Sequence, residues 1–499
     1  MKYMNIVFNE LKFNLFLLNI FLIIISTIYN KSFIIVNLFY LIYTFIIYKK
    51  FSTNNRKYLY YTVLFYALVT GGNSKYVFIF YLIYLIELFL DNRTNHFNKA
   101  NDVIKYKKYY VFFFIFISYM FLSIFIAKYK IESIKYLLKY MIMIAIFIMM
   151  VIENRDIKNL NGTLRFLCVF YAGILALGTL ELFGIKYGPR NIFMDKNMVS
   201  SYIKRIPEVF YYNPNNYSVV LDLGIAALFI KSLFTDMKKE KIFYYFLIFL
   251  SEVQLIFASS RIAWIVLFCT FMFIIFVGII NIKNNKMLAK TFMFRSIMAF
   301  ILSFILFFML ALLPSMSPYY KKFADSIVIN KVRESVLPKN YIDNMKIHED
   351  VNINTQIKIG GKGSENERFT LMKNVVDGVI VERNLLGFGV GNIGSYVKQK
   401  NNTFGIINIH SFWFEYLGDF GIFMFAYLII IYCMMLLDLF KLYWTSNNNS
   451  KEYYIILLIL GIIMVLLAFS PSTVIGFSPF WIVLGMNFGI ASNKLNYLA

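Results

Sequence analysis

Arg261 stands at the boundary between two apolar stretches and is the first residue whose type and position suggest chemistry. Only Ala258-Ser259-Ser260 separates it from the preceding stretch, so the chain must turn very tightly there. An arginine at a helix end can simply extend its charge toward water or lipid headgroups. Its planar guanidinium can also pair bidentately with phosphate oxygens, which makes Arg261 a candidate for binding a phosphorylated substrate.

A basic loop precedes the apolar stretch that starts near residue 214. It ends in Asn213-Pro214-Asn215-Asn216 and contains five basic residues, Lys186, Arg190, Lys196, Lys204 and Arg205. Two interpretations remain open. The loop is either solvated and drawn to lipid headgroups, or it forms an electropositive entrance for an anionic substrate.

A glycine-rich segment, Leu386-Gly387-Phe388-Gly389-Val390-Gly391, precedes the apolar stretch near residue 410. The glycine pattern is similar to a dinucleotide-binding fingerprint, but no clear strand precedes it and no clear helix follows. We therefore expect a tight turn in which the backbone closely approaches a neighbouring element.

His410 opens the apolar stretch that follows the glycine-rich segment, and the chain has only three histidines. A lone histidine at an interface is often structural, but one with a pKa near neutrality can accept a proton from a hydroxyl. If the helix starts at His410, helical spacing places Trp413 and Phe414 beside it and Asp419 on the opposite face. Neither Asp419 nor Glu415 is then an obvious partner that orients the imidazole.

The elements that must position these residues are membrane helices. The chain is 60% hydrophobic and 15% charged, and the apolar residues fall in blocks long enough to cross a bilayer core of about 30 Å. We predict an all-α polytopic membrane protein with about fourteen spans (12–14), at residues 13–29, 33–48, 58–70, 76–90, 109–127, 136–152, 164–184, 214–234, 242–258, 262–281, 292–313, 410–437, 453–470 and 474–491. The first block has no small-residue cleavage site after it, so we expect a retained helix.

Basic residues predict the orientation, because Lys and Arg collect in cytoplasmic loops. They favour cytoplasmic termini at both ends of the chain. The organisation is then spans 1–11 in residues 1–313, one large extracytoplasmic loop in residues 314–409, and spans 12–14 in residues 410–499. We expect the protein in the cytoplasmic (inner or plasma) membrane, with any chemistry at the outer face.

Composition also excludes several classes of function. The net charge of +23 follows from the cytoplasmic loops, so no nucleic-acid partner is expected. Cys168, Cys269 and Cys433 all lie in apolar blocks, and His348-Glu349-Asp350 are consecutive and point in different directions. We therefore expect no metal site and no cofactor. The cytoplasmic loops are too short for a nucleotide-binding module, which argues against an ATP-driven transporter.

The ordered set of features resembles the O-antigen ligase and polysaccharide polymerase family of bacterial membrane proteins. The matching features are an Asn-Pro-Asn element opening a span, Ser260-Arg261 opening another, and a long outside loop. In that loop come an Arg-led helix from Arg368 to Val381, a Leu-Gly-x-Gly turn, and a His-Ser step before a span with two glycines. The resemblance covers about residues 190–499.

The resemblance implies a metal-independent glycosyltransferase with a GT-C-like, all-helical membrane fold. Its donor would be an undecaprenyl-diphosphate-linked glycan, and its acceptor a sugar hydroxyl on another glycan, a lipid or a protein. Arg261 would contact the diphosphate and His410 would be the second catalytic residue. The other expected substrate-binding residues are Arg190 or Arg205, Arg368, Arg383 and Asn215. Asp195 and Glu208 remain possible bases, and Arg368 could instead cap the loop helix.

Alternatives of other classes remain open. A lipid-linked oligosaccharide flippase could also have fourteen spans and a cationic cavity, but it would not need so large an outside loop. A mannosyltransferase-like polyprenyl-phosphate enzyme would need acidic residues in its first outside loop, where this chain has none. We favour a polymerase over a ligase, because nothing indicates a lipid A-core acceptor. A flippase and a chain-length regulator are the expected protein partners.

Overall fold

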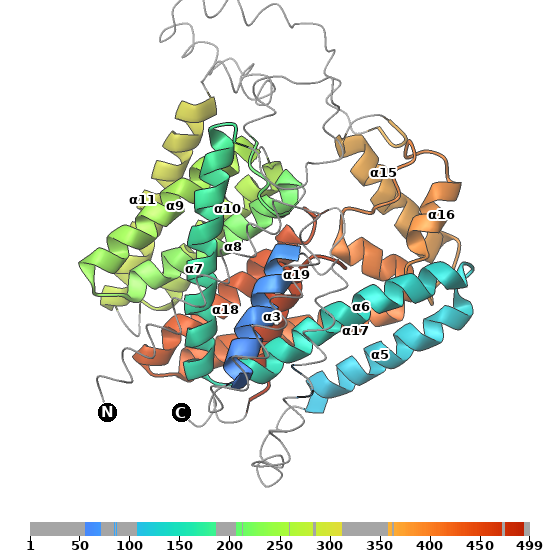
Figure 1. The fold of residues 1–499 in the computed structure, drawn as a ribbon, viewed down its shortest axis with the longest axis horizontal. Helices are drawn as coiled ribbons and strands as arrows, with labels where there is room; N and C mark the ends of the chain where they lie inside the picture. The colour runs from blue at the N-terminus through green and yellow to red at the C-terminus, as the bar shows by residue number, and fades with distance from the viewer. Residues whose placement is uncertain are drawn as a thin grey trace, which may run out of the picture.

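The computed structural model describes residues 55–70, 84, 86, 107–185, 206–311 and 358–493, apart from short gaps at 212, 259, 283–285, 362–363 and 472–474. Within these residues every regular element is a helix (Figure 1). The predicted spans at 13–29 and 33–48, nearly all of 76–90, and the loop residues 314–357 lie outside the described residues.

Nine helices in the described part of the chain are long and apolar enough to cross a membrane. They are α5 (Lys107–Ile126), α6 (Lys130–Glu153), α7 (Ile157–Leu182), α8 (Pro214–Phe234), α9 (Lys238–Ala258), α10 (Arg261–Ile280), α11 (Lys286–Ala311), α17 (Phe412–Thr445) and α18 (Asn448–Leu467). Each coincides with a predicted span, so the prediction of a multi-pass helical membrane protein is confirmed. Two shorter helices, α3 (Asn55–Thr70) and α19 (Ser478–Ala491), match the predicted spans 58–70 and 474–491.

Helix boundaries differ from the prediction where polar residues join the helices. Helix α6 begins at Lys130 and α7 at Ile157, six and seven residues before the predicted apolar starts. Asp156 caps α7, because its carboxylate accepts the Asn159 N–H at 2.8 Å. Helix α17 extends to Thr445 and has a non-helical residue, Gly421, inside it. Apolarity thus located the spans, whereas capping and tertiary contacts set their ends.

Helix α8 is the most buried of the nine candidate spans, and α11 buries the least. Helices α9, α10 and α11 lie together on one side of the molecule, whereas α5 and α6 form an antiparallel pair on the other (Figure 1). Most apolar side chains of α11 therefore point outward, as expected for a helix that is surrounded by lipid.

Several helix ends gather at one end of the bundle, which we call the site side. There the Phe412 N–H donates to the Ala468 carbonyl at 3.0 Å, and the Ser478 hydroxyl donates to the Ala67 carbonyl at 2.5 Å. The hydroxyl of Ser470 also lies 3.4 Å from the Asn215 carbonyl. The turns predicted to lie outside the cytoplasm thus share one end.

The opposite end is fastened by ionic and polar contacts between helices far apart in sequence. Lys108 pairs with Asp438 at 2.6 Å and Lys231 with Glu452 at 3.3 Å. These contacts lie at the start of α5 and the end of α8, where the basic residues were predicted to face the cytoplasm.

The described part of the large loop folds into a small helical unit on the site side. It contains α15 (Ser364–Val376), the π-helix η4 (Asp377–Val381) and α16 (Ile393–Gln399). The helix predicted from Arg368 to Val381 therefore begins four residues earlier than expected. Seven buried side chains form the unit's core: Leu371, Val375, Val379, Ile393, Val397, Ile409 and Leu417. Because Leu417 belongs to α17, this unit is packed directly on a membrane helix.

Candidate functional site

The glycine-rich segment joins the loop unit to the membrane helices by backbone contacts. Gly387, Gly389 and Gly391 all have positive φ angles, between 74° and 86°. The Phe388 N–H donates to the Gly418 carbonyl at 2.9 Å, and the Gly389 N–H donates to the Asp419 carbonyl at 3.0 Å. The tight turn with close backbone approach expected from the sequence is what the structure contains.

Gly421 provides the matching surface on α17. Its φ of 75° interrupts the helix, and a Cβ placed on it would lie 2.2 Å from the Leu385 carbonyl oxygen. The next N–H, of Ile422, donates to that same carbonyl at 3.0 Å. The kink in α17 therefore lies where the glycine turn packs against this helix. Both segments need glycine there, because their backbones are in contact and a Cβ would not fit between them.

Asp419 holds the same turn through its side chain. It is fully buried, and its two carboxylate oxygens accept the N–H groups of Gly391 at 2.7 Å and Ile393 at 3.1 Å. A buried carboxylate needs such donors, because an unpaired buried charge is strongly destabilising. Asp419 is thus a positioning residue for the turn, a role that spacing from His410 did not indicate.

Asn392 fastens the other side of the turn to the α5–α6 hairpin. Its side-chain oxygen accepts the Tyr129 N–H at 2.8 Å, and its amide donates to the Ser133 hydroxyl at 2.7 Å. The Val390 N–H also donates to the Ser123 hydroxyl at 3.2 Å. The loop unit therefore bridges α5, α6 and α17, as seen at the right of Figure 1.

His410 does not open α17 as the sequence suggested. The helix begins at Phe412, and His410 precedes it with a left-handed φ of 57°. The helical spacing that placed Trp413 and Phe414 beside the imidazole was therefore wrong, because the helix does not include residue 410. The Trp413 indole instead donates to the Val465 carbonyl at 2.9 Å.

The His410 imidazole is half-buried, and its Nδ1 atom is buried without a hydrogen-bond partner. Burial, followed by the positive charge of Arg368, lowers the pKa of His410 to about 4. The side chain is therefore a neutral imidazole at pH 7, with a nitrogen lone pair that can accept a proton or a hydrogen bond.

Arg368 links His410 to Arg261. Burial and then the nearby charge of Arg261 lower the pKa of Arg368 below its ordinary value. Arg261 is the first residue of α10 and is exposed, whereas Arg368 lies in α15 and is half-buried. Three of the residues predicted from the sequence thus lie within electrostatic range along the line Arg261–Arg368–His410. Like charges that act on each other in this way would both be favoured by a bound anion.

The remaining predicted residues lie apart from this line or outside the described residues. Arg383 is exposed, follows η4 and has a φ of 60°. The Asn215 N–H donates to the Asn213 side chain at the start of α8. Glu208 is buried beside Glu181, whose carboxylate accepts the N–H groups of Glu208 and Val209 at 2.6 and 3.0 Å. Arg190, Arg205 and Asp195 are outside the described residues.

Sequence reasoning missed Glu181 as an organiser of the chain before α8. The available signal was an acidic residue in the last turn of a predicted membrane helix, a position where a carboxylate needs a donor. In the described chain, no cluster of three His, Cys, Asp or Glu side chains has the arrangement of a metal site.

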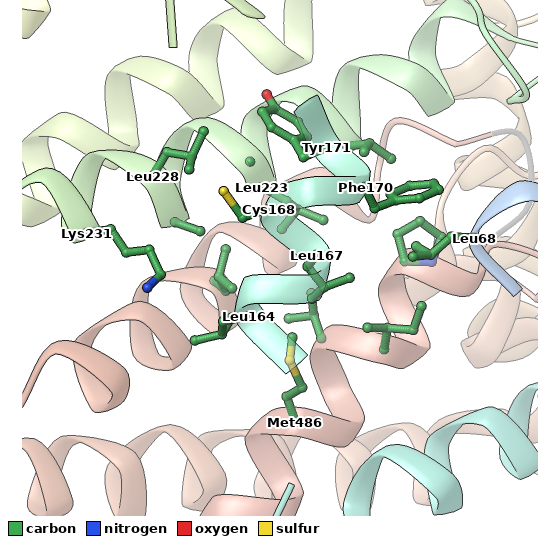
Figure 2. A pocket seen from close by; sticks show the side chains of 17 residues that line it. Leu68, Leu164, Leu167, Cys168, Phe170, Tyr171, Leu223, Leu228, Lys231 and Met486 are labelled. Carbon is green, nitrogen blue, oxygen red and sulfur yellow. The ribbon is translucent and has the colours of Figure 1, made fainter. Parts of the chain in front are cut away.

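An apolar cavity lies within the bundle between α3, α7, α8, α18 and α19 (Figure 2). Its lining includes Leu164, Leu167, Phe170 and Leu223, and Lys231 contributes a cationic side chain (Figure 2). None of Arg261, Arg368 and His410 lines it. The cavity suits hydrocarbon, whereas the arginine–histidine line suits charged and polar groups.

Comparison with known proteins places the site residues in one family segment. No curated protein and no solved structure matches the chain. A family model described as O-antigen ligase matches residues 245–429, a range that includes Arg261, Arg368, the glycine turn and His410. The resemblance predicted from the sequence is therefore confirmed for residues 245–429 of this membrane protein, which are similar to the O-antigen ligase family.

Proposed function

We propose that the protein is a polysaccharide polymerase or ligase. It transfers glycan from an undecaprenyl-diphosphate-linked donor to a glycan hydroxyl at the outer face of the cytoplasmic membrane. The observation that supports this function best is the electrostatic line Arg261–Arg368–His410, assembled from α10, α15 and the residue before the Ser411 cap of α17. The family match supports an enzyme of this kind and gives no support to a flippase.

The two arginines are suited to bind the diphosphate. When the glycosidic C–O bond breaks, the electron pair leaves with the phosphate oxygen, and negative charge builds on the leaving undecaprenyl diphosphate. Guanidinium groups already held in position stabilise that charge with little reorganisation. Arg261 would contact the diphosphate, and Arg368 would add a second positive charge. Burial, followed by the charge of Arg368, keeps His410 neutral before the donor binds.

His410 is suited to receive the proton. The acceptor hydroxyl oxygen forms the new bond to the anomeric carbon, and its proton passes to the neutral imidazole. A bound diphosphate would offset the charge of Arg368 and raise the pKa of His410 toward its ordinary value, which improves it as a base. Of the other candidates, Arg190 or Arg205 and Asn215 would supply further donor contacts at the start of α8.

Substitution of Arg261 and of His410 tests the proposed function. Arg261→Ala and His410→Asn should each lower transfer from a purified undecaprenyl-diphosphate-linked oligosaccharide by about 10²–10⁴-fold. Asparagine is chosen at position 410 because it tolerates the left-handed backbone found there. In cells, both variants should lose long-chain glycan and accumulate single lipid-linked units on the outer face.

Arg165 provides a matched control, because it is an exposed arginine on α7, away from the line. Arg165→Ala should retain normal transfer at equal protein levels. Long-chain glycan at normal amounts in both line variants would contradict the assignment, and lipid-linked units retained on the cytoplasmic face would indicate a flippase instead.

A further inference from the structure

The chain from η4 to the glycine turn exposes four large apolar side chains. Ile380, Val381, Leu385 and Leu386 are 48%, 70%, 39% and 51% exposed. In a loop surrounded by water, such a group would be unusual, since large exposed apolar patches mark contact surfaces. Their depth relative to the membrane helices indicates what they contact.

The length of helix α5 can be used to measure that depth. Its 20 residues span about 30 Å, the thickness of the hydrocarbon core, so the helix needs nearly its full length to cross. Lys128 and Lys130 follow directly after it and are exposed, as expected for residues at the level of the headgroups. The end of α5 at Ile126 therefore marks the membrane boundary on the site side.

Leu386 lies below this boundary. Its carbonyl accepts the Tyr119 hydroxyl at 2.7 Å, and Tyr119 precedes the end of α5 by seven residues, about 10 Å. Four residues further along the loop, the Val390 N–H reaches Ser123, which is about 4–5 Å below the same end. The chain is therefore deepest in the membrane near Leu386 and has returned toward the boundary by Val390.

The outward-facing residues of α5 at this level are apolar. Phe121, Leu122 and Phe125 are 47%, 59% and 78% exposed on α5, the helix whose Tyr119 contacts Leu386. The loop patch thus lies on an element in contact with a helix that exposes apolar side chains, as expected for a surface that faces lipid.

Backbone hydrogen bonding in the segment agrees with a location in hydrocarbon, where irregular chain is tolerated only if its polar groups have partners. The Leu385 and Leu386 carbonyls accept the Ile422 N–H and the Tyr119 hydroxyl. The five N–H groups of the segment that follows donate to protein acceptors, in residues 387, 388, 389, 390 and 391. These partners satisfy the Leu385 and Leu386 carbonyls and the N–H groups of residues 387–391 without water.

We propose that residues 380–386 are a membrane-inserted edge of the loop unit, in contact with the acyl chains of the leaflet on the site side. Glu382 and Arg383 lie between the two apolar pairs and are exposed. Glu382 pairs with Lys400 at 2.6 Å, and the Arg383 guanidinium extends to the phosphates of neighbouring lipids by snorkelling. This assigns Arg383 to the lipid headgroups rather than to the donor. The edge fixes the height of Arg368 and His410 relative to the bilayer, where a lipid-linked donor must present its diphosphate.

The test uses fluorescence quenching and requires no activity, so it is independent of the proposed function. The three native cysteines are replaced, and single cysteines at Val381 and Leu386 are labelled with an environment-sensitive fluorophore in full-length protein. The labelled protein is placed in phosphatidylethanolamine–phosphatidylglycerol nanodiscs, with or without brominated acyl chains. Phe125→Cys on α5 is the lipid reference, and Lys398→Cys, exposed on α16, is the aqueous reference.

Probes at 381 and 386 should lose fluorescence to brominated acyl chains as strongly as the probe at 125, and aqueous iodide should barely affect them. The probe at 398 should behave in the opposite way. If the probes at 381 and 386 follow the one at 398, with iodide quenching and no response to brominated lipid, the edge lies in water and the proposal is wrong.

Discussion

At His410, backbone conformation and electrostatics act on the same side chain. A left-handed φ at a non-glycine residue is uncommon and tends to persist only where the surroundings enforce it. At His410 this conformation places the imidazole in a half-buried position near the charge of Arg368. The result is a histidine that stays neutral at pH values where an ordinary one would be protonated.

The neutrality of His410 can be measured without turnover. In a variant whose other two histidines, His96 and His348, are replaced, the rate of diethyl pyrocarbonate modification reports the neutral fraction of His410. Because the pKa of His410 is lowered to about 4, the rate should stay nearly constant from pH 8 to about pH 5 and fall only below it.

Arg368→Gln removes a charge that lowers this pKa, so the fall should move to higher pH. Arg165→Gln, which alters an arginine away from the line, should leave the profile unchanged. A profile that falls near pH 6.5 in the parent protein, with no response to Arg368→Gln, would show that the imidazole is neither buried nor near the arginine.

At the scale of elements, the docking of the glycine turn on α5 and α17 decides whether the loop unit is held in place. Gly389 and Gly405 offer a matched comparison, since both have left-handed φ angles of 86° and 83°. A Cβ on Gly389 would lie 2.6 Å from the Ser123 carbonyl oxygen, whereas nothing lies within 4 Å of one on Gly405.

Gly405→Ala should therefore lose only the conformational contribution, about 1–2 kcal/mol. Gly389→Ala should lose more, because overpacking against a helix backbone adds roughly 1–3 kcal/mol. Thermal unfolding in detergent, followed by intrinsic fluorescence, measures the difference. Equal decreases in melting temperature for the two variants would mean that the turn is not packed against α5.

The same elements show what sequence could and could not predict. The spans and the tight glycine turn followed from apolar block length and glycine spacing. The choice of Arg261 and His410 as candidates followed from residue types at block ends, whereas Arg368 entered through the family resemblance. The role of Asp419 did not follow, because helical spacing was counted from His410 and the helix begins two residues later. Hydrogen bonds from a side chain to a distant backbone, such as those of Asp419 and Asn392, leave no local pattern in sequence.

At the scale of the whole molecule, the helix ends form two distinct surfaces. The site side gathers the turns near Tyr129, Arg261 and Ser470 with the loop unit, whereas the opposite end gathers charged pairs such as Lys108 with Asp438. This separation agrees with the predicted topology, in which the loop unit lies outside the cytoplasm.

Cysteine accessibility in intact cells tests the orientation. Lys398→Cys on the loop unit should react with a membrane-impermeant maleimide, whereas Lys239→Cys, exposed at the start of α9, should react only after permeabilisation. The unsubstituted protein corrects for its own three cysteines. Labelling of residue 239 but not 398 in intact cells would reverse the topology and place the site in the cytoplasm.

The contact between Val390 and Ser123 joins residues 267 positions apart in the chain, and Asp419, which also holds the turn, is synthesised later still. During translation, the surface of α5 and α6 that contacts the glycine turn therefore stays uncovered in the bilayer until α17 has been inserted. The candidate site is then among the last parts of the protein to form, and a nascent chain interrupted before α17 is a set of membrane helices without that site. Premature termination anywhere before residue 419 should thus remove activity completely rather than in proportion to the length lost.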